Sequence, residues 1–251
     1  MTRKPTIAVV DYHKGNLSSV ARGLDRAGAH ALVTDDPVQI CSADGIVLPG
    51  VGSFYDAIVF MHKTGQDKAI IETVSGDNHI PFLGICLGLQ LLVERGDEGV
   101  PLDVELHAAT DARGSKLNPG DVFEVDGRRW VRGLGLLHGS CSILPSRRLK
   151  VPHVGWDQLH MVSSASDCPL LSGVDEGVNM YFTHSYALDS DVDASAVAAR
   201  TFYARDFGSV VWSDNVFGCQ FHPEKSSAHG LKILRNFVRI ATEQCGGGEA
   251  L

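Results

Sequence analysis

Residues 81–90 read Pro-Phe-Leu-Gly-Ile-Cys-Leu-Gly-Leu-Gln, an apolar strand that passes into a helix between two glycines. The spacing around Cys86 matches the G-x-nucleophile-x-G elbow, with cysteine in place of the usual serine. In such an elbow the glycines allow a tight turn that exposes the central side chain. The helix N-terminus then favours a thiolate and offers N–H groups to an oxyanion. A free cysteine is most often a small buried hydrophobe, but this context indicates a nucleophile at Cys86.

Strand and helix patterns alternate on both sides of this stretch through the first half of the chain. Short apolar runs predict strands at residues 6–10, 31–34, 45–48 and 80–84. Helical spacing predicts a helix capped by Asn16 and stopped by Gly28, and the expected helices cover residues 17–27, 55–64, 66–74 and 87–94. The alternation predicts an α/β fold with a mostly parallel central sheet flanked by helices, in which ligands lie at the carboxyl ends of the strands.

The second half is dominated by strand patterns and predicts an antiparallel extension of the sheet. The strands are expected at residues 151–159, 179–186, 196–203 and 210–221, the last with a hairpin turn at 213–215. An amphipathic helix is expected over about 231–241. Residues 100–130 are polar and carry no motif, which predicts a surface excursion, and the tail at 245–251 is expected to fray. No repeat or linker interrupts the pattern, so we expect a single domain over residues 1–251.

Composition and charge narrow the functional classes. The 251 residues are 44% hydrophobic, and 22 Lys plus Arg against 30 Asp plus Glu give a net charge of −8 with no basic block. A nucleic-acid partner is therefore not expected. No apolar run is long enough for a membrane span or a signal peptide, which predicts no membrane association. The six cysteines form no CxxC pair, so we expect a cytoplasmic protein without a metal site.

A cysteine nucleophile needs a base and a group that orients the base. Among the eleven histidines, His222 stands apart because it follows a predicted strand and precedes Pro223-Glu224. The proline restrains the backbone at the strand end, and Glu224 can turn towards the imidazole. This spacing is compatible with a Cys86-His222-Glu224 triad in which the carboxylate fixes the tautomer of the base.

Two segments, residues 84–90 and 220–226, together resemble the class I (triad) glutamine amidotransferases, a family with a flavodoxin-like α/β fold. Further segments are similar, more narrowly, to the glutaminase subunits of imidazole glycerol phosphate synthase; they are residues 11–17, 48–54, 152–156 and 181–186. The matching motifs run from residue 11 to residue 226, so the resemblance covers nearly the whole chain. It implies that the chain forms one glutamine amidotransferase domain.

The resemblance also implies a role for each matching residue. Cys86 would be the nucleophile, His222 the general acid and base, and Glu224 the carboxylate that orients it. The residues that would border the oxyanion site or hold the substrate glutamine are Gly50, Val51, Gly52, Leu87, Gln90, Ser185 and Tyr186. The residues that would face a partner subunit are Asn16, Trp156, Tyr181 and Lys225.

The activity that the family implies is hydrolysis of L-glutamine to glutamate and ammonia through a cysteinyl thioester, with no metal or organic cofactor. It also implies a heterodimer with a (β/α)₈-barrel cyclase subunit, which would use the ammonia to form imidazole glycerol phosphate in histidine biosynthesis. Two alternatives stay open at this point. One is a glutaminase subunit of a different amidotransferase, and the other is a catalytically silent scaffold paralogue.

Three features depart from the pattern of the narrower family. His13 stands where glycine is frequent, Asp157 stands where asparagine is usual, and residues 100–130 look like an insertion. None of them lies in the proposed triad, so they bear on the partner interface rather than on the chemistry. The segment 50–52 has unusual backbone freedom, which is compatible with a peptide flip that gates the oxyanion site and equally with a fixed oxyanion hole.

Overall fold

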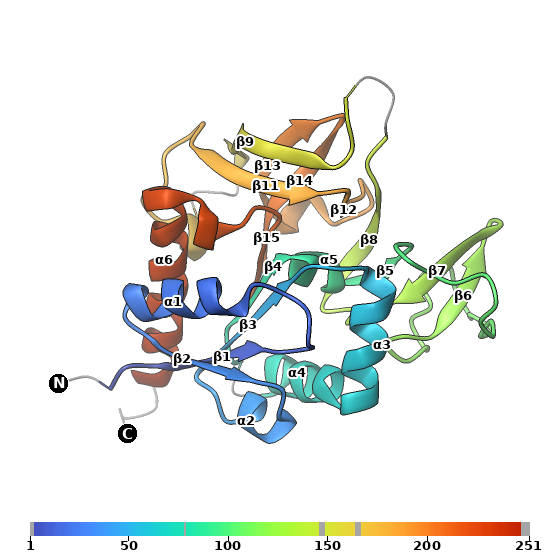
Figure 1. The fold of residues 1–251 in the computed structure, drawn as a ribbon, viewed down its shortest axis with the longest axis horizontal. Helices are drawn as coiled ribbons and strands as arrows, with labels where there is room; N and C mark the ends of the chain where they lie inside the picture. Colours follow the sequence, from blue (N-terminus) through green and yellow to red (C-terminus); the bar gives the residue numbers. More distant parts are fainter. Residues whose placement is uncertain (1–2, 78, 146–148, 164–166, 247–251) are drawn as a thin grey trace.

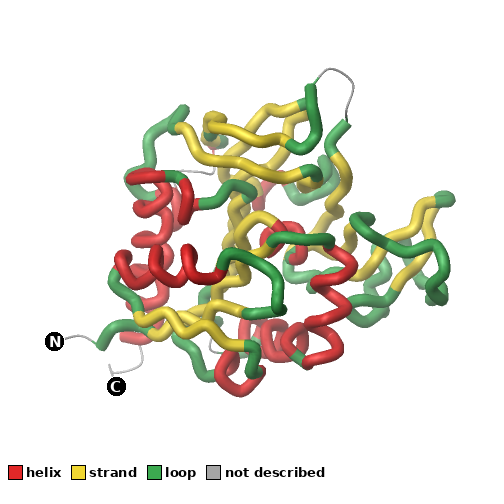
Figure 2. The backbone as a smooth tube through the Cα atoms, viewed as in Figure 1, coloured by secondary structure: helices red, strands yellow, loops and turns green. Residues whose placement is uncertain are grey.

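The computed structural model describes residues 3–77, 79–145, 149–163 and 167–246, and its largest element is an eight-stranded sheet. The strand order is β10-β13-β14-β15-β4-β3-β1-β2, and helices lie on both sides of it (Figure 1, Figure 2). Within the described residues there are also a five-stranded sheet in the order β12-β8-β5-β7-β6 and a ladder of β9 and β11. This architecture confirms the expected α/β class.

The first half of the chain builds the parallel part of the large sheet. β1 (Thr6–Val10) pairs in parallel with β2 (His30–Thr34) and β3 (Gly45–Gly50). β4 (Phe82–Cys86) lies between β3 and β15 (Val216–Cys219) and is parallel to both. The helices are α1 Leu17–Ala27, α2 Pro37–Cys41, α3 Phe54–Thr64, α4 Gln66–Ser75, α5 Leu87–Leu91 and α6 Ser227–Gly246.

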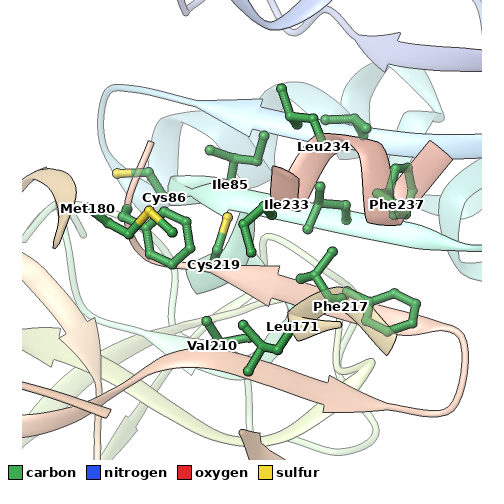
Figure 3. Close-up of a cluster of buried hydrophobic side chains, with 14 of the residues drawn as sticks. Ile85, Cys86, Leu171, Met180, Val210, Phe217, Cys219, Ile233, Leu234 and Phe237 are labelled. Carbon is green, nitrogen blue, oxygen red and sulfur yellow. The ribbon is translucent and has the colours of Figure 1, made fainter. Parts of the chain in front are cut away.

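Alternate residues of the central strands contribute to two hydrophobic cores, one on each face of the sheet. In β3, Val47 belongs to the core formed with α1 and α6, whereas Ile46 and Leu48 belong to the core formed with α2, α3 and α4. Figure 3 shows the first core, where Phe237 of α6 lies near strand β15 and Ile85 projects from β4. Both faces of β4 are therefore sealed from water up to the end of the strand.

The second half of the chain extends the sheet with antiparallel strands, as expected. β14 (Arg205–Ser213) forms a hairpin with β15, and the turn holds Asp214 at a φ of 54°. β13 (Val197–Tyr203) pairs antiparallel with β14, and β10 (His160–Met161) pairs with β13. The ladder outside this sheet joins β9 (His153–Gln158) to β11 (Asn179–His184).

The helix expected at residues 87–94 is wrong in its second half. α5 ends at Leu91, and Val93–Gly96 forms β5, which pairs with two strands from much later in the chain. These partners are β7 (Arg128–Arg132) and β8 (Leu137–Ile143), and β6 (Val122–Val125) and β12 (Tyr186–Leu188) complete the five-stranded sheet. Long-range pairing thus overrides the local apolar pattern.

The segment 100–130 is a surface excursion only in its first part. Its last third forms β6 and the start of β7, where Phe123 is fully buried and Trp130 is 5% exposed. The polar part is fastened to the sheet by arginines: Arg95 donates to the carbonyl of Ala112 and Arg129 to the carbonyl of Pro101. The segment 100–130 therefore contributes buried side chains, which its polar composition does not predict.

The predicted C-terminal stop of the first helix is confirmed, whereas the closing helix is longer than expected and runs over Ser227–Gly246. Gly28 ends α1 with a left-handed φ of 109°, but the side chain of Asn16 makes no capping hydrogen bond at its start. The short helix α2, which the sequence pattern missed, is capped by Asp36, whose carboxylate accepts from the Val38 N–H at 2.9 Å. Single 3₁₀ turns occupy Pro169–Leu171, Ala194–Ala196 and Pro223–Lys225. The expected frayed tail lies, from residue 247 onward, outside the described residues.

Among the described helices, none is both long enough and apolar enough to cross a membrane.

Candidate active site

Cys86 lies at the junction of β4 and α5 and has a strained backbone. Its φ is 54° and its ψ is −107°, a region that side chains other than glycine rarely adopt. The turn is possible because its flanking glycines pack against backbone. A Cβ on Gly88 would lie 1.7 Å from the Leu48 carbonyl oxygen, and one on Gly84 would lie 2.5 Å from the Gly88 carbonyl oxygen. The thiol is thereby held at the carboxyl end of the sheet, 6% exposed.

The strand next to β4 positions the predicted base, His222. β15 runs parallel to β4, with Cys219 opposite Ile85, so the chain that leaves β15 brings His222 to the same edge as Cys86. His222 Nδ1 lies 2.8 Å from Glu224 Oε1, and both side chains are buried. The backbone around the base is also held, because the His222 N–H donates to the Tyr181 carbonyl at 2.9 Å. The structure thus brings the three predicted triad residues together.

The electrostatics of the base favour its protonated form. Burial opposes a charge on the imidazole, but the interactions with Cys86 and Glu224 outweigh it and raise the pKa of His222 to about 10. His222 Nε2 and Glu224 Oε2 are buried and have no hydrogen-bond partner among the described residues. His222 can therefore hold a proton at Nε2 and donate it to a group that binds at the sulfur.

The strand on the other side of β4 provides the predicted oxyanion segment. Gly50, the last residue of β3, is paired with Cys86, and a Cβ at this position would lie 2.3 Å from the Tyr12 hydroxyl oxygen. Val51 is 43% exposed, and its carbonyl accepts from the Tyr12 hydroxyl at 3.4 Å. Burial, followed by the charge of Cys86, raises the pKa of Tyr12 above its usual value and keeps this donor protonated. Gly52 follows with a left-handed φ of 111°.

A cavity of about 200 Å³ opens beside the Cys86 thiol. Every residue predicted to border the oxyanion site or to hold the substrate lines it: Gly50, Val51, Gly52, Leu87, Gln90, Ser185 and Tyr186. Gln90 is 3% exposed, and its Nε2 donates to the Tyr186 carbonyl at 2.7 Å. The walls therefore combine the backbone of residues 50–52 with one side-chain amide, that of Gln90, which is held by a hydrogen bond.

Glu98 also lines this cavity, and sequence reasoning missed it. Burial and the nearby charges of Asp97 and Asp56 raise the pKa of Glu98 to about 7, although a hydrogen bond from the Phe54 N–H acts in the opposite direction. A half-buried carboxyl with a perturbed pKa in a cleft is a candidate functional group. The local signal was weak, because an acidic residue in the polar run after β5 looks like ordinary surface.

Three of the four predicted interface residues form one cluster, in which Trp156 and Lys225 are exposed and Tyr181 is half-buried. Trp156 of β9 and Tyr181 of β11 are cross-strand partners with ring centroids 5.9 Å apart, and Lys225 Nζ lies 5.8 Å from the Tyr181 ring. Trp156 is 54% exposed. Asn16 is also exposed, at the start of α1. A half-exposed tryptophan with an aromatic and a cationic neighbour is typical of a protein-binding surface.

No group of three His, Cys, Asp or Glu side chains that could hold a metal ion is present in the part of the chain that the structure describes. The groups gathered at the cavity are a thiol, an imidazole, carboxylates and amides.

Comparison with known proteins places this chain in a family. Residues 8–241 match the model of the family "Glutamine amidotransferase class-I". The chain is 40% identical over 231 residues to "Imidazole glycerol phosphate synthase subunit HisH" of Syntrophotalea carbinolica, covering 92% of this chain and 98% of the relative. The protein of the same name from Halobacterium salinarum is 43% identical over 244 residues, covering 96% of each chain.

Solved structures share the fold at low sequence identity. PurLQS from Thermotoga maritima matches with a TM-score of 0.66 at 18% identity over 95% of this chain and 99% of the other. The glutaminase domain of CTPS from Trypanosoma brucei, with bound acivicin, matches with a TM-score of 0.59 at 15% identity over 96% of this chain and 94% of the other. Both comparisons support the architecture of the sheet.

Proposed function

Because the chain belongs to the class I glutamine amidotransferase family, we propose that it is the glutamine-hydrolysing subunit of an imidazole glycerol phosphate synthase. Relatives that carry this name are 38–43% identical and align over most of their own length. The single observation that carries the proposal is the buried array of Cys86, His222 and Glu224 beside a cavity large enough for a small amino acid.

The first half of the reaction acylates the enzyme. The Cys86 proton passes to His222 Nε2, and the thiolate attacks the carboxamide carbon of glutamine, which moves the carbonyl electrons onto oxygen. Collapse of this tetrahedral intermediate breaks the C–N bond while His222 returns its proton to the nitrogen, so ammonia leaves and a γ-glutamyl thioester remains. The high pKa of His222 suits the imidazolium that this sequence requires.

The second half releases glutamate. His222 takes a proton from water, and the hydroxide that forms attacks the thioester carbon. The C–S bond then breaks, and the thiolate recovers the proton. Glu224, held 2.8 Å from Nδ1, keeps the imidazole in the tautomer that leaves Nε2 facing the sulfur.

The developing oxyanion needs donors at both strand ends. The N–H of Leu87 at the start of α5 and an N–H of the 50–52 segment are the groups that we assign to it. The Tyr12 hydroxyl holds the Val51 carbonyl, so the orientation of this segment is set by one hydrogen bond and the freedom of two glycines. Losing one such donor typically lowers kcat by about 10²–10³. A flip of this segment on docking would therefore switch the glutaminase.

We assign the polar end of the cavity to the amino-acid head of glutamine. Glu98, when ionised, offers a carboxylate to the α-ammonium group, and Gln90, Ser185 and Tyr186 complete the pocket. The whole chain, residues 1–251, then acts as one glutaminase domain in the cytoplasm. No cofactor enters this chemistry.

The ammonia would pass to a separate (β/α)₈-barrel cyclase subunit. The cluster of Trp156, Tyr181 and Lys225, with Asn16, is the surface that we assign to this heterodimer. We expect the isolated subunit to be a poor glutaminase that its partner activates.

The proposal is tested by reconstituting the complex with the cyclase subunit of the same organism. We expect glutamine turnover and imidazole glycerol phosphate formation by the wild type. Cys86→Ala should abolish glutamine-dependent synthesis and leave synthesis from ammonium salts intact, because free ammonia bypasses the thioester. Glutamine turnover by Cys86→Ala would disprove the assigned nucleophile. Turnover without complementation of a histidine auxotroph would assign the chain to a different synthase, and no turnover at all would identify a silent scaffold.

A further inference from the structure

Gln220 touches the nucleophile, although the reaction described above gives it no role. It is fully buried between the end of β15 and His222. Its Nε2 donates to Cys86 Sγ at 3.7 Å, and its Oε1 accepts from Gln90 Nε2 at 3.2 Å. Gln220 therefore connects the sulfur to the wall of the substrate cavity.

The orientation of the Gln220 amide is decided by its neighbours. Gln90 Nε2 lies 2.7 Å from the Tyr186 carbonyl, which can only accept, so the nitrogen of Gln90 must point that way. The second N–H of the same nitrogen then points at Gln220, which must present its oxygen to it. The nitrogen of Gln220 is left facing the sulfur.

Two buried histidines extend this hydrogen-bond network. His184 Nδ1 lies 2.8 Å from the Tyr186 carbonyl, so Nδ1 carries the proton. Burial is the main cause that lowers the pKa of His184 to about 3, so the ring is neutral and its Nε2 can only accept. His153 Nδ1 lies 3.2 Å from that Nε2, and His153 Nε2 lies 3.5 Å from Asp157 Oδ2. The direction of the hydrogen bonds is therefore fixed from His184 to the sulfur.

We propose that Gln220 is a further catalytic residue, whose amide N–H stabilises the Cys86 thiolate, and that His184 and Gln90 are positioning residues that hold this amide in place. The catalytic part of this inference rests on the proposed glutaminase function. As a thiol, Cys86 can donate to the Thr183 carbonyl at 3.8 Å, but the thiolate loses this bond and can only accept. The Gln220 N–H already points at the sulfur, so the charge forms without reorganisation of its surroundings.

The test measures the reactivity of Cys86 without using glutamine or a partner. The full-length chain is alkylated with iodoacetamide from pH 5 to 10, and the rate at Cys86 is followed by peptide mass spectrometry. Gln220→Met keeps the length of the side chain and removes the donor. We expect the pH midpoint for alkylation to rise by about one unit and the rate at pH 7 to fall about tenfold, because thiolates are the reactive form.

The matched control is Gln66→Met. Gln66 is also fully buried and donates to the Asp11 and Asp35 carbonyls, and it does not line the cavity beside the sulfur. This variant should lose stability but keep the wild-type pH midpoint at Cys86. If Gln220→Met does not fold by circular dichroism, Gln220→Leu serves in its place. An unchanged midpoint in a folded Gln220 variant overturns the inference.

A pair of His184 variants tests the positioning residues. The amide of His184→Asn can place an N–H near the position of Nδ1, where it still donates to the Tyr186 carbonyl. The longer side chain of His184→Gln places its amide near the position of Nε2 and loses that donor. We expect His184→Asn to keep the wild-type midpoint and His184→Gln to move it in the same direction as Gln220→Met; the reverse order would overturn the proposed direction of the chain. A wild type that hydrolyses no glutamine with its partner, yet shows these shifts, would instead remove the proposed function and leave Gln220 as a group that stabilises the thiolate.

Discussion

At the scale of single residues, the backbone of Cys86 is fixed in a strained conformation by its neighbours. Its left-handed backbone costs of order 1–3 kcal/mol, and it persists only because the surrounding structure leaves no alternative. Gly84 and Gly88 provide this constraint, since a side chain on either would collide with backbone atoms. The nucleophile therefore faces the cavity in every folded molecule, before any substrate arrives.

His222 and Glu224 carry unequal shares of the chemistry. His222→Ala removes the group that moves the proton, whereas Glu224→Gln removes only the charge that orients and stabilises it. We expect His222→Ala to lower kcat by orders of magnitude more than Glu224→Gln, measured with the partner bound. Equal losses would show that Glu224 is more than an orienting group.

The ionisation of Glu98 should appear in the binding of glutamine. Its folded pKa of about 7 lies above the ordinary value of 4.5, so the carboxylate that attracts an α-ammonium group forms only as pH rises through about 7. KM for glutamine should therefore fall as pH rises through about 7. Glu98→Gln should raise KM at least about tenfold, because it loses a charge-assisted hydrogen bond worth about 1.5–3 kcal/mol. The same variant should make KM nearly independent of pH over this range. Glu105→Gln, on the exposed part of the excursion, is the control.

The same titration has a consequence for stability. Because the folded state holds the Glu98 proton more tightly than the unfolded state, the folded protein should lose stability as pH rises from about 4.5 to about 7. Glu98→Gln should lack this loss. Urea unfolding of the two proteins at pH 5 and pH 8 measures the difference, and parallel pH dependence in both would contradict the assignment.

The proximity of Cys86, His222 and Glu224 could be predicted from the sequence because local signatures mark both ends of the array. The elbow glycines identify Cys86, and the proline after His222 identifies the strand end. Glu98 and Gln220 lack such signatures. Their roles depend on which side chains a distant strand brings within a few ångströms, and that information is absent from local spacing.

At the scale of elements, the central sheet follows from the sequence and the five-stranded sheet does not. β1, β3 and β4 are apolar runs bounded by turns, so their pattern suffices. β5 has only four residues, begins two residues after α5 ends, and finds its partners more than thirty residues away. A short strand with no turn before it cannot be told from the end of a helix by periodicity alone.

Trp130 is a large buried side chain of the five-stranded sheet that the sequence did not predict. It is 5% exposed, and the guanidinium groups of Arg95 and Arg128 lie 4.4 and 4.2 Å from its ring centre. Trp130→Ala should lower the free energy of unfolding by about 3–5 kcal/mol, as for a large buried aromatic side chain. Phe202→Ala, at a position 65% exposed on β13, should change it little. Urea titration of both variants measures these changes. If Trp130→Ala lowers the free energy of unfolding as little as Phe202→Ala does, the five-stranded sheet does not contribute to the stability of the fold.

At the scale of the whole molecule, the catalytic edge and the aromatic cluster are linked by β11. Tyr181 of the cluster accepts the His222 N–H at its carbonyl, and Thr183 and His184 of the same strand line the cavity. A partner that binds the cluster therefore contacts a strand that also contacts His222 and lines the cavity, so a shift of this strand would reach both. This route does not require any residue of the triad to move.

Trp156 should dominate the affinity for the cyclase subunit. Exposed aromatic anchors at interfaces commonly contribute about 2 kcal/mol or more, so Trp156→Ala should raise Kd about thirtyfold. The alkylation rate of Cys86 in the free subunit should stay as in the wild type. Titration calorimetry with the cyclase subunit measures the affinity; a Kd unchanged within twofold would place the docking surface elsewhere.

The position of β15 in the middle of the sheet has a consequence for biosynthesis. Gln220 and Cys86 are in contact although 134 residues separate them in the chain. While the ribosome is still translating that interval, β4 has an unpaired edge and its cysteine has no base. An unpaired edge is open to aggregation, and pairing across so long an interval is slow. The nascent chain thus carries an unactivated thiol through synthesis, and its reactivity appears only when residues 216–224 join the sheet.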